Sequence, residues 1–284
     1  MRITSLFRKK LSAADIIILA VLLVLSILMI SPFIWMLSIS FERTANLQPP
    51  FPPSFYPKNA SVFNYDIVME NATLFKSYLN SGLVAACVVC LSVSSSLLAG
   101  YAFAKGQFKG KKALFLIVLA TMMIPMETRL IPLFTMFNKF GLINTFIPLI
   151  APAILYGFGI LLCKQYFDQL PDSLREAAQI DGSSEGRTFL QIYVPLTGPI
   201  IATLAILSFL ESWNAFLWPL VVINDHELRT IPIFLASFSF ENGTRLAGLT
   251  MALAAASIAP IIVVFLFLQK YIIRSIALSG LKGE

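Results

Sequence analysis

The feature that most constrains this chain is a run of apolar residues from Ile16 to about Ile39, which is long enough to cross a membrane. As a helix rising ~1.5 Å per residue, the run would be about 36 Å long, and the hydrocarbon core of a bilayer is ~30 Å thick. Only 13% of the residues are charged, whereas soluble domains carry about 25%. A surface that faces water cannot be built from so few charges, so lipid must be the solvent for much of this chain.

Five more apolar stretches follow the first. The six predicted spans cover residues of about 16–39, 78–104, 113–132, 145–167, 199–223 and 246–271. Pro125 and Pro132 interrupt the third, so its helix is expected to end near Met126 with a bent segment beyond it. The sequence therefore predicts an all-α membrane protein with six transmembrane helices.

The polar segments complete the domain organisation. We expect a short N-terminal segment at 1–15, the six-helix domain at 16–271, a polar loop at 168–198 within that domain, and a tail at 272–284. The segment Phe41–Lys76 is rich in proline, which excludes a continuous helix. One short helix is expected in it, near Tyr65–Glu70.

The lysines and arginines predict the orientation. With the N-terminus inside, the inner segments hold fourteen of them: four in Met1–Asp15, four in Lys105–Lys112, three in Lys164–Gly198 and three from Lys270 onward. The outer segments hold seven. Short loops rich in Lys and Arg stay in the cytoplasm, so both termini and the 168–198 loop are expected inside.

The net charge of +6 does not indicate nucleic acid, because the basic residues cluster beside the apolar runs, where they set membrane orientation. The loop Lys105–Lys112 contains Gly106 and Gly110-Lys111 but lacks the spacing of a phosphate-binding loop. We therefore expect this chain to bind no cofactor and not to hydrolyse ATP by P-loop chemistry.

The 168–198 loop reads as two short helices joined by a sharp turn. Ser173 and Glu176 have capping-box spacing, so a helix is expected from Leu174. Gly182 is placed to end that helix in a left-handed conformation, and a second helix is expected over Ser184–Val194. Ala177 and Ala178 would let another surface approach closely. From the residues alone, a knob for a partner's groove and an amphipathic loop on the membrane surface remain equally open.

Glu176-Ala177-Ala178, Gly182 and Ile192-x-x-Pro195 resemble the EAA motif of ABC importer permeases. Ser183 stands where the motif has alanine, and Val194 where it has leucine. Further pieces in the order of that family are Tyr101–Lys105, Met123–Pro125, Ile131–Phe134, Gly141–Thr145, Trp213–Phe216, Trp218–Leu220 and the tail from Gln269 to Gly283. Together they resemble the smaller six-helix permease of the carbohydrate-uptake, maltose-type branch.

That resemblance implies a type I ABC importer permease fold in a bacterial cytoplasmic membrane. It implies as partners a second permease, an extracellular solute-binding protein and two ATPase subunits, which bind the ATP and Mg. The residues expected at the ATPase contact are Glu176, Ala177, Ala178, Asp181, Gly182 and Pro195, with Lys282 and Gly283 in the tail. Ala178→Arg is expected to uncouple ATP hydrolysis from uptake.

A polar group interrupts the fifth predicted span. Its members are Glu211, Ser212, Trp213 and Asn214, with Trp218 one turn beyond. A carboxylate at membrane depth costs a few kcal/mol, so such groups usually face a cavity or a partner helix. These residues are candidates for a carbohydrate pathway, and burial of Glu211 against the second permease is the alternative.

A rival function belongs to another class. An ion-gradient-driven secondary carrier or channel would work without an ATPase, and such proteins often show internal repeats and charges at the membrane midplane. The sequence shows no clear repeat and only Glu211 as a deep charge. No nucleophile–base group supports an enzyme.

Overall fold

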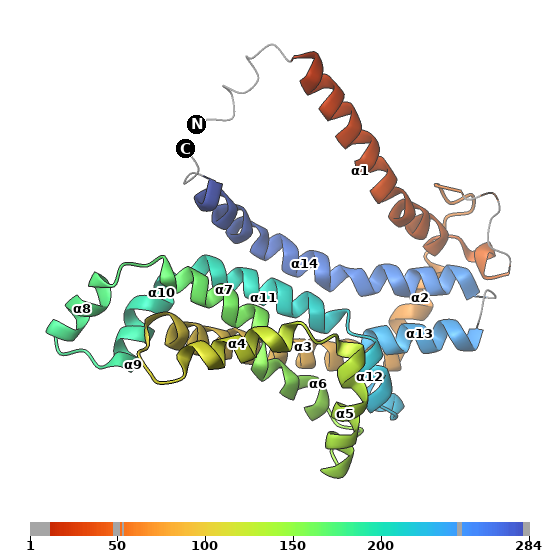
Figure 1. The fold of residues 1–284 in the computed structure, drawn as a ribbon. Coiled ribbons are helices and arrows are strands. Elements are labelled where there is room, and N and C mark those ends of the chain that lie inside the picture. The colour runs from red at the N-terminus through yellow and green to blue at the C-terminus, as the bar shows by residue number, and fades with distance from the viewer. Residues whose placement is uncertain (1–11, 48–51, 53, 243–245, 281–284) are drawn as a thin grey trace. The chain divides into compact units, whose positions relative to one another are not determined.

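The computed structural model describes residues 12–47, 52, 54–242 and 246–280, and these residues form a helical fold (Figure 1). No β-strand is found within these ranges, although Glu42 and Ala60 form an isolated antiparallel bridge. The α-helices are α1 (Ala13–Ser40), α2 (Phe63–Glu70), α3 (Ala72–Lys105), α4 (Lys111–Met122), α5 (Met126–Lys139), α6 (Ile147–Ile150), α7 (Gly157–Asp168), α8 (Ser173–Ile180), α9 (Glu185–Thr188), α10 (Val194–Leu196), α11 (Gly198–Trp213), α12 (Leu217–Val222), α13 (Ile231–Asn242) and α14 (Ala247–Gly280). Shorter helical turns are η2 (Arg43–Asn46), η3 (Ala151–Leu155), the π-helical η4 (Phe189–Tyr193) and η5 (His226–Leu228).

Four helices of the described residues are long and apolar enough to cross a membrane. They are Ala13–Ser40, Ala72–Lys105, Ile147–Asp168 and Ala247–Phe267. Two bent helix pairs bring the number to six if each pair forms one span: α4 with α5, bent by 102°, and Glu185–Leu196 with α11, bent by 79°. The structure thus gives four to six candidate spans, within which the predicted count of six falls. The expected short helix near Tyr65–Glu70 is α2.

The predicted span 199–223 is not one continuous helix. Helix α11 ends at Trp213, and a separate short helix, α12, starts at Leu217. Asn214 is the C-cap residue of α11: its side chain donates to the carbonyl of Leu210 at 2.9 Å, and its N–H donates to the same carbonyl at 3.1 Å. Pro219 has no N–H with which to continue the ladder.

The predicted span 113–132 is broken earlier than expected. Helix α4 ends at Met122, and α5 begins at Met126, with Pro125 as its N-cap residue. A residue that precedes proline is driven out of the helical region, so Ile124 cannot continue α4. The bent segment that the sequence indicated is therefore the separate helix α5.

The contacts divide the chain into two compact units, Met1–Glu70 with Phe238–Ala256, and Asn71–Ser237 with Ser257–Glu284. A buried polar network organises the first unit. The Asn64 side chain donates to the carbonyl of Ser40 at 2.9 Å and accepts from the Asn46 amide at 2.7 Å. The Asn46 oxygen in turn accepts from the backbone N–H of Leu249 at 2.9 Å. This network ties the end of α1 to α2 and to the start of α14.

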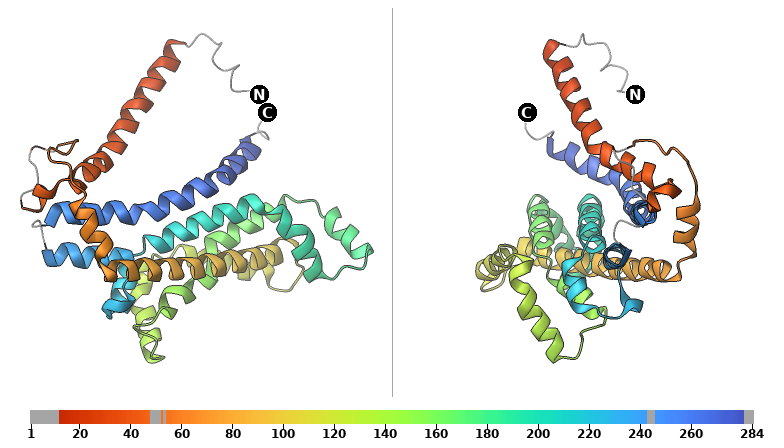
Figure 2. Two further views of the ribbon diagram at one scale, coloured as in Figure 1. Left: turned by 180° about the vertical axis from the view of Figure 1, so that it is seen from behind. Right: turned by 90° about the vertical axis from the view of Figure 1, so that its right-hand side faces the viewer.

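In the second unit, α3, α7 and α11 run side by side (Figure 2). Small residues let α3 and α7 approach closely, as membrane helices require because lipid gives no hydrophobic drive for their association. A Cβ added at Gly100 would lie 2.4 Å from the Cβ of Cys163 and 2.9 Å from the backbone N of Lys164. Gly159 of α7 similarly fits against Ser96 of α3. The close packing of α3 against α7 therefore requires glycine at these two positions, because a side chain at either one would clash with the other helix.

We expect Gly100→Ala to destabilise the protein, because the new methyl group would collide with the α7 backbone. Gly82→Ala on the same helix is the matched control, since no atom lies within 4 Å of a Cβ built there. That control should be neutral or should stabilise by up to about 1 kcal/mol through helix propensity. Thermal unfolding of both purified variants in detergent would measure the difference. A melting temperature of Gly100→Ala equal to that of Gly82→Ala would contradict the packing described.

Candidate functional site

The 168–198 loop forms two helical pieces that project beyond the end of α3, α7 and α11 (Figure 1). Helix α8 begins at Ser173, one residue earlier than expected, and its N-cap residue is Asp172. The predicted capping box is absent, because no side chain caps the start of α8. The expected second helix, Ser184–Val194, is present as the continuous helical run of α9, η4 and α10, which ends at Leu196.

Gly182 makes the turn between the two pieces, as the sequence predicts. Its φ of 75° lies in the left-handed region, which glycine enters without steric penalty. The N–H of Ser183 donates to the carbonyl of Ala178 at 2.9 Å, and the N–H of Gly182 donates to that of Gln179 at 3.1 Å. This pair of bonds is a Schellman motif, which closes the C-terminus of α8 and fixes the direction in which the chain leaves it.

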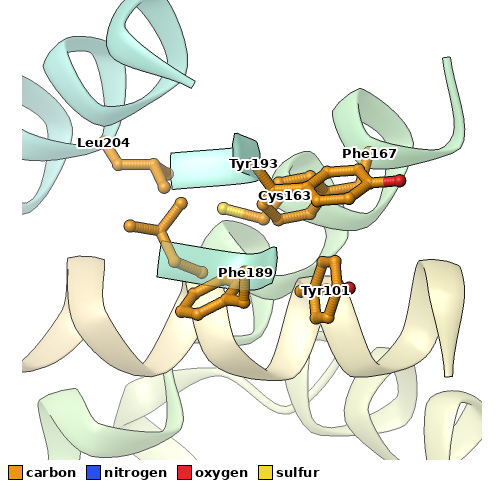
Figure 3. Packing of buried hydrophobic residues seen from close by; sticks show 7 residues of the cluster. Tyr101, Cys163, Phe167, Phe189, Tyr193 and Leu204 are labelled. Atoms are coloured by element: carbon orange, nitrogen blue, oxygen red, sulfur yellow. The ribbon is translucent and has the colours of Figure 1, made fainter. Parts of the chain in front are cut away.

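An aromatic cluster anchors the loop to the long helices (Figure 3). Its rings are those of Tyr101 on α3, Phe167 on α7, and Phe189 and Tyr193 on η4. The Tyr101 ring centroid lies 4.9 Å from that of Tyr193, 5.0 Å from that of Phe189 and 5.6 Å from that of Phe167. Buried aromatic pairs of this geometry add roughly 0.5–1.5 kcal/mol beyond their buried area. The π-helical turn is therefore fastened to α3 and α7 by packing.

Hydrogen bonds to a charged side chain also attach this loop to α3. The Tyr101 hydroxyl donates to Oε1 of Glu185 at 2.6 Å. The Arg175 guanidinium also binds Glu185, through Nε at 2.9 Å and Nη2 at 3.1 Å. One carboxylate on α9 thus joins α8 to α3.

A buried lysine makes a second connection. Lys105, at the end of α3, has a side chain only 5% exposed, and its ammonium donates to Asp172 at 2.6 Å and to the carbonyl of Leu170 at 2.7 Å. A buried ammonium needs such partners, since an unpaired one would lose its hydration without compensation. Lys105 therefore holds the segment before α8 to α3, as Tyr101 holds Glu185 after it.

These contacts shift the pKa of both carboxylates. The hydrogen bonds from Arg175 hold the pKa of Glu185 below its usual value, with Tyr101 adding to the effect against partial desolvation. The hydrogen bond and the charge of Lys105 likewise hold the pKa of the Asp172 carboxyl below its usual value. Both groups are charged at neutral pH, so the two polar links are intact there.

The predicted ATPase-contact residues do not all lie on the surface. Glu176, Ala177, Asp181, Gly182 and Pro195 are exposed. Ala178 is only 4% exposed, because its side chain faces the protein rather than solvent. Lys282 and Gly283 lie outside the described residues. Consequently Ala178→Arg would disturb the fold itself and does not test docking.

Sequence reasoning missed Ile180, which is 87% exposed at the end of α8. It follows Glu176 by four residues and Ala177 by three, so the three share one face of the helix. The sequence contained a signal for it, because Ile180 is a large apolar residue within a polar loop. Residues two apart on a helix lie on nearly opposite faces, so Ile180 points away from Ala178.

A cavity of about 600 Å³ lies in the second unit, between the α4–α5 break and the α11–α12 break. Of the predicted pathway residues, Glu211, Ser212 and Trp218 line it. Trp213 and Asn214 do not: Trp213 is buried and donates to the carbonyl of Ser257 at 3.2 Å, and the Asn214 amide bonds its own helix. Trp218 lines the cavity with its Nε1 already donating to the carbonyl of Pro148 at 2.8 Å.

Further lining residues come from segments that the sequence did not connect with this span. They include Glu127 and Arg129 of α5, Tyr156, Phe158 of α7, and Thr230. Only the fold brings these positions together. Within the described residues, no group of three or more His, Cys, Asp or Glu could hold a metal ion.

A bundle of apolar helices with an open cavity and an anchored polar loop is compatible with a membrane transport subunit. A family profile described as "Binding-protein-dependent transport system inner membrane component" matches residues 96–278. This chain therefore belongs to that family of inner-membrane permeases. Members are non-catalytic membrane subunits of ABC transporters, whose ATPase is a separate chain.

Individual relatives agree with this assignment. The arabinooligosaccharides transport system permease protein AraQ of Halalkalibacterium halodurans is 38% identical over 230 residues, which cover 81% of this chain and 82% of that protein. The trehalose/maltose transport system permease protein MalG of Thermococcus litoralis is 34% identical over 267 residues, which cover 92% and 95%.

A solved structure shares the fold. It is the crystal structure of a bacterial ABC transporter involved in the import of the acidic polysaccharide alginate, of which one chain superimposes with a TM-score of 0.81. The match covers 93% of this chain and 99% of that chain at 24% identity. It supports the fold of an ABC importer permease, and the localisation follows from the family: a multi-pass protein of the inner membrane.

The depressed pKa of Glu185 predicts the pH dependence of stability. Its folded pKa lies below the ordinary value of 4.5, so its stabilising contribution is complete above about pH 4.5 and disappears as the pH falls through the folded pKa. The difference in melting temperature between wild type and Glu185→Gln should therefore be constant at neutral and mildly acidic pH and shrink below that value. Thermal unfolding in detergent as a function of pH measures it.

Glu70→Gln serves as the control, because Glu70 is exposed and lies outside the loop. A difference for Glu185→Gln that disappears already near neutral pH, or that grows as the pH falls, would contradict the arrangement of Arg175, Tyr101 and Glu185.

Proposed function

We propose that this chain is the permease subunit of an ATP-driven sugar importer, and that α8 is the element through which a separate ATPase moves it. The named relatives transport arabino-oligosaccharides and trehalose or maltose, which supports a sugar or sugar derivative as cargo. The complete transporter would contain a second permease, two ATPase subunits that bind ATP and Mg, and an extracellular solute-binding protein. This chain binds no nucleic acid and forms no covalent bond with the cargo.

The proposed orientation has six spans with both termini and the 168–198 loop in the cytoplasm. The excess of Lys and Arg in those segments supports it. In this orientation the exposed end of α8 faces the ATPase, and the Lys105–Lys112 loop lies beside it.

The observation that carries the proposal is the contrast between the two faces of α8. One face presents Glu176, Ala177 and Ile180 to solvent, while Ala178 faces inward. An exposed isoleucine beside a small residue suits a helix face that binds in a partner's groove. This favours a docking role over an amphipathic loop on the membrane, since the loop is also fastened rigidly to α3.

The mechanism follows from those fastenings. When the ATPase closes on ATP, it moves α8, and the Arg175–Glu185–Tyr101 contacts and Lys105 pass the movement to α3. Helix α3 packs along α7 and α11, so the walls of the cavity move with it. Closure opens the cavity outward, and hydrolysis returns it to the inward-facing state.

A secondary carrier would need no ATPase, and none of the comparisons supports that alternative. Purification separates the two: an importer permease should bring an ATPase out of detergent with it, whereas a carrier would be isolated alone.

Ala177→Arg is expected to weaken the coupling of ATP hydrolysis to sugar uptake, because the long cationic side chain would fill the space that a docked partner needs. In the reconstituted transporter, uptake should fall at least about tenfold, the loss of ~1.4 kcal/mol of docking energy. The protein itself should fold, since Ala177 is exposed. Ala177→Ser is the control and should retain uptake. Normal uptake by Ala177→Arg, with the ATPase still bound, would exclude docking at this face.

Tyr101→Phe tests the transmission. It removes the hydroxyl bonded to Glu185 and keeps the ring in its cluster, so stability should fall by only about 1 kcal/mol. We expect less sugar to be transported per ATP hydrolysed, while the binding of the ATPase is unchanged. Uptake and ATP hydrolysis measured together in proteoliposomes give that ratio, and an unaltered ratio would remove Tyr101 from the pathway of movement.

A further inference from the structure

The cavity between the α4–α5 and α11–α12 breaks has the composition of a ligand site. Its volume, about 600 Å³, lies within the range of small-molecule sites, which combine apolar and aromatic walls with a few polar groups. Exposed rings of Phe158 and Phe216 form part of the wall. Aromatic faces of this kind pack against the C–H faces of sugar rings.

Glu211 is the polar group that most needs an explanation. It lines the cavity on α11 and is exposed. Within the described residues it makes no hydrogen bond and no ion pair, although Arg129 lies close enough for its charge to act on the carboxylate. An ionisable group at membrane depth is usually retained for a function. A carboxylate offers up to four acceptor sites, and no described residue donates a hydrogen bond to that of Glu211.

A second observation is independent of Glu211. Thr230 lies at the cavity wall, is only 5% exposed, and its Oγ1 is buried without a hydrogen-bond partner. Leaving a buried hydroxyl unpaired costs about 1–3 kcal/mol. The wall therefore carries a carboxylate and a hydroxyl without hydrogen bonds among the described residues, and the exposed carboxylate of Glu211 suits a ligand rich in hydroxyl groups.

The charges of the wall discriminate between classes of sugar. Its charged members are Glu127, Arg129 and Glu211, two carboxylates against one guanidinium. A neutral sugar can donate hydroxyl protons to Glu211, whereas a sugar acid would bring a second negative charge towards a carboxylate in a medium of low dielectric constant.

We propose that this subunit itself binds the cargo in this cavity, and that Glu211 selects uncharged, polyhydroxylated ligands over acidic ones. This inference rests on the proposed sugar import but adds a binding residue and a class of substrate to it. The guest hydroxyls donate to Glu211, and the exposed rings of Phe158 and Phe216 cover the apolar faces of the sugar.

Uptake by the complete reconstituted transporter tests the residue. The probes are the neutral sugars arabinotriose, maltose and trehalose, and trigalacturonate as the acidic counterpart. Glu211→Gln should raise the KM for the transported neutral sugar about tenfold, the loss expected for hydrogen bonds to a charged group. It should also reduce the preference over trigalacturonate. Thr203→Ala is the control on the same helix, because Thr203 does not line the cavity and bonds its own helix.

The outcomes separate this inference from the proposed function. If wild type imports a neutral probe with ATP and Glu211→Gln is unchanged in KM and preference, the binding role of Glu211 is overturned while sugar import stands. A wild type that prefers trigalacturonate overturns the charge selection in the same way. No ATP-dependent uptake of any probe would remove the proposed function, and this inference with it.

Chemical labelling tests the position independently of transport. Ser212→Cys is made in a protein whose Cys87, Cys90 and Cys163 are replaced by serine. In the assembled transporter, a cationic methanethiosulfonate should label this cysteine faster than an anionic one, and Glu211→Gln should abolish the difference. Resistance of the cysteine to both reagents would place this wall against the second permease and overturn the inference.

Discussion

The contact between Tyr101 and the 168–198 loop is the interaction on which the functional architecture depends. The ring of Tyr101 packs against residues of α7 and η4, and its hydroxyl reaches the carboxylate that also holds α8. One side chain thus belongs to the apolar core of the bundle and to the polar rim of the loop. Without it, α8 would be joined to the long helices chiefly by Lys105. The proposed transmission of movement requires a rigid attachment, and this attachment combines packing with charge-assisted hydrogen bonds.

The sequence alone predicted the elements whose signals are local. The long apolar runs indicated α1, α3 and α14, and Gly182 marked the turn after α8, because a left-handed residue is needed there. The break after Trp213 was missed, since the apolar pattern continues through it into Leu217–Val222. The capping box at Ser173 was a match of spacing that the structure does not use.

Some residues of the candidate sites could be identified from the sequence, and others could be identified only from the fold. Glu211, Ser212 and Trp218 could be found because polar or amphipathic residues within an apolar run are conspicuous, and all three line the cavity. Arg129 and Thr230 could not be assigned to it, because their proximity is created by tertiary packing over long separations in sequence. Ala178 was placed on the docking face by the motif, but the rotation of α8 about its axis turns it inward. Periodicity alone does not fix that rotation without knowledge of the anchoring contacts.

The break between α11 and α12 leaves non-helical backbone beside the cavity. Helix α11 has 16 residues, so it rises about 24 Å, which is less than the ~30 Å thickness of the hydrocarbon core of a bilayer. Backbone that leaves the helical state at membrane depth is tolerated only where protein or water satisfies its polar groups. Ala215 and Phe216, in the break, line the cavity, and protein groups bond the backbone there: the N–H of Ala215 donates to the carbonyl of Ser212 at 3.3 Å, and the carbonyl of Phe216 accepts from the N–H of Leu220 at 2.9 Å. In the proposed transporter, a cavity bordered by such a break has to stay closed on one side at all times, because an open path across the membrane would dissipate the ion gradients of the cell.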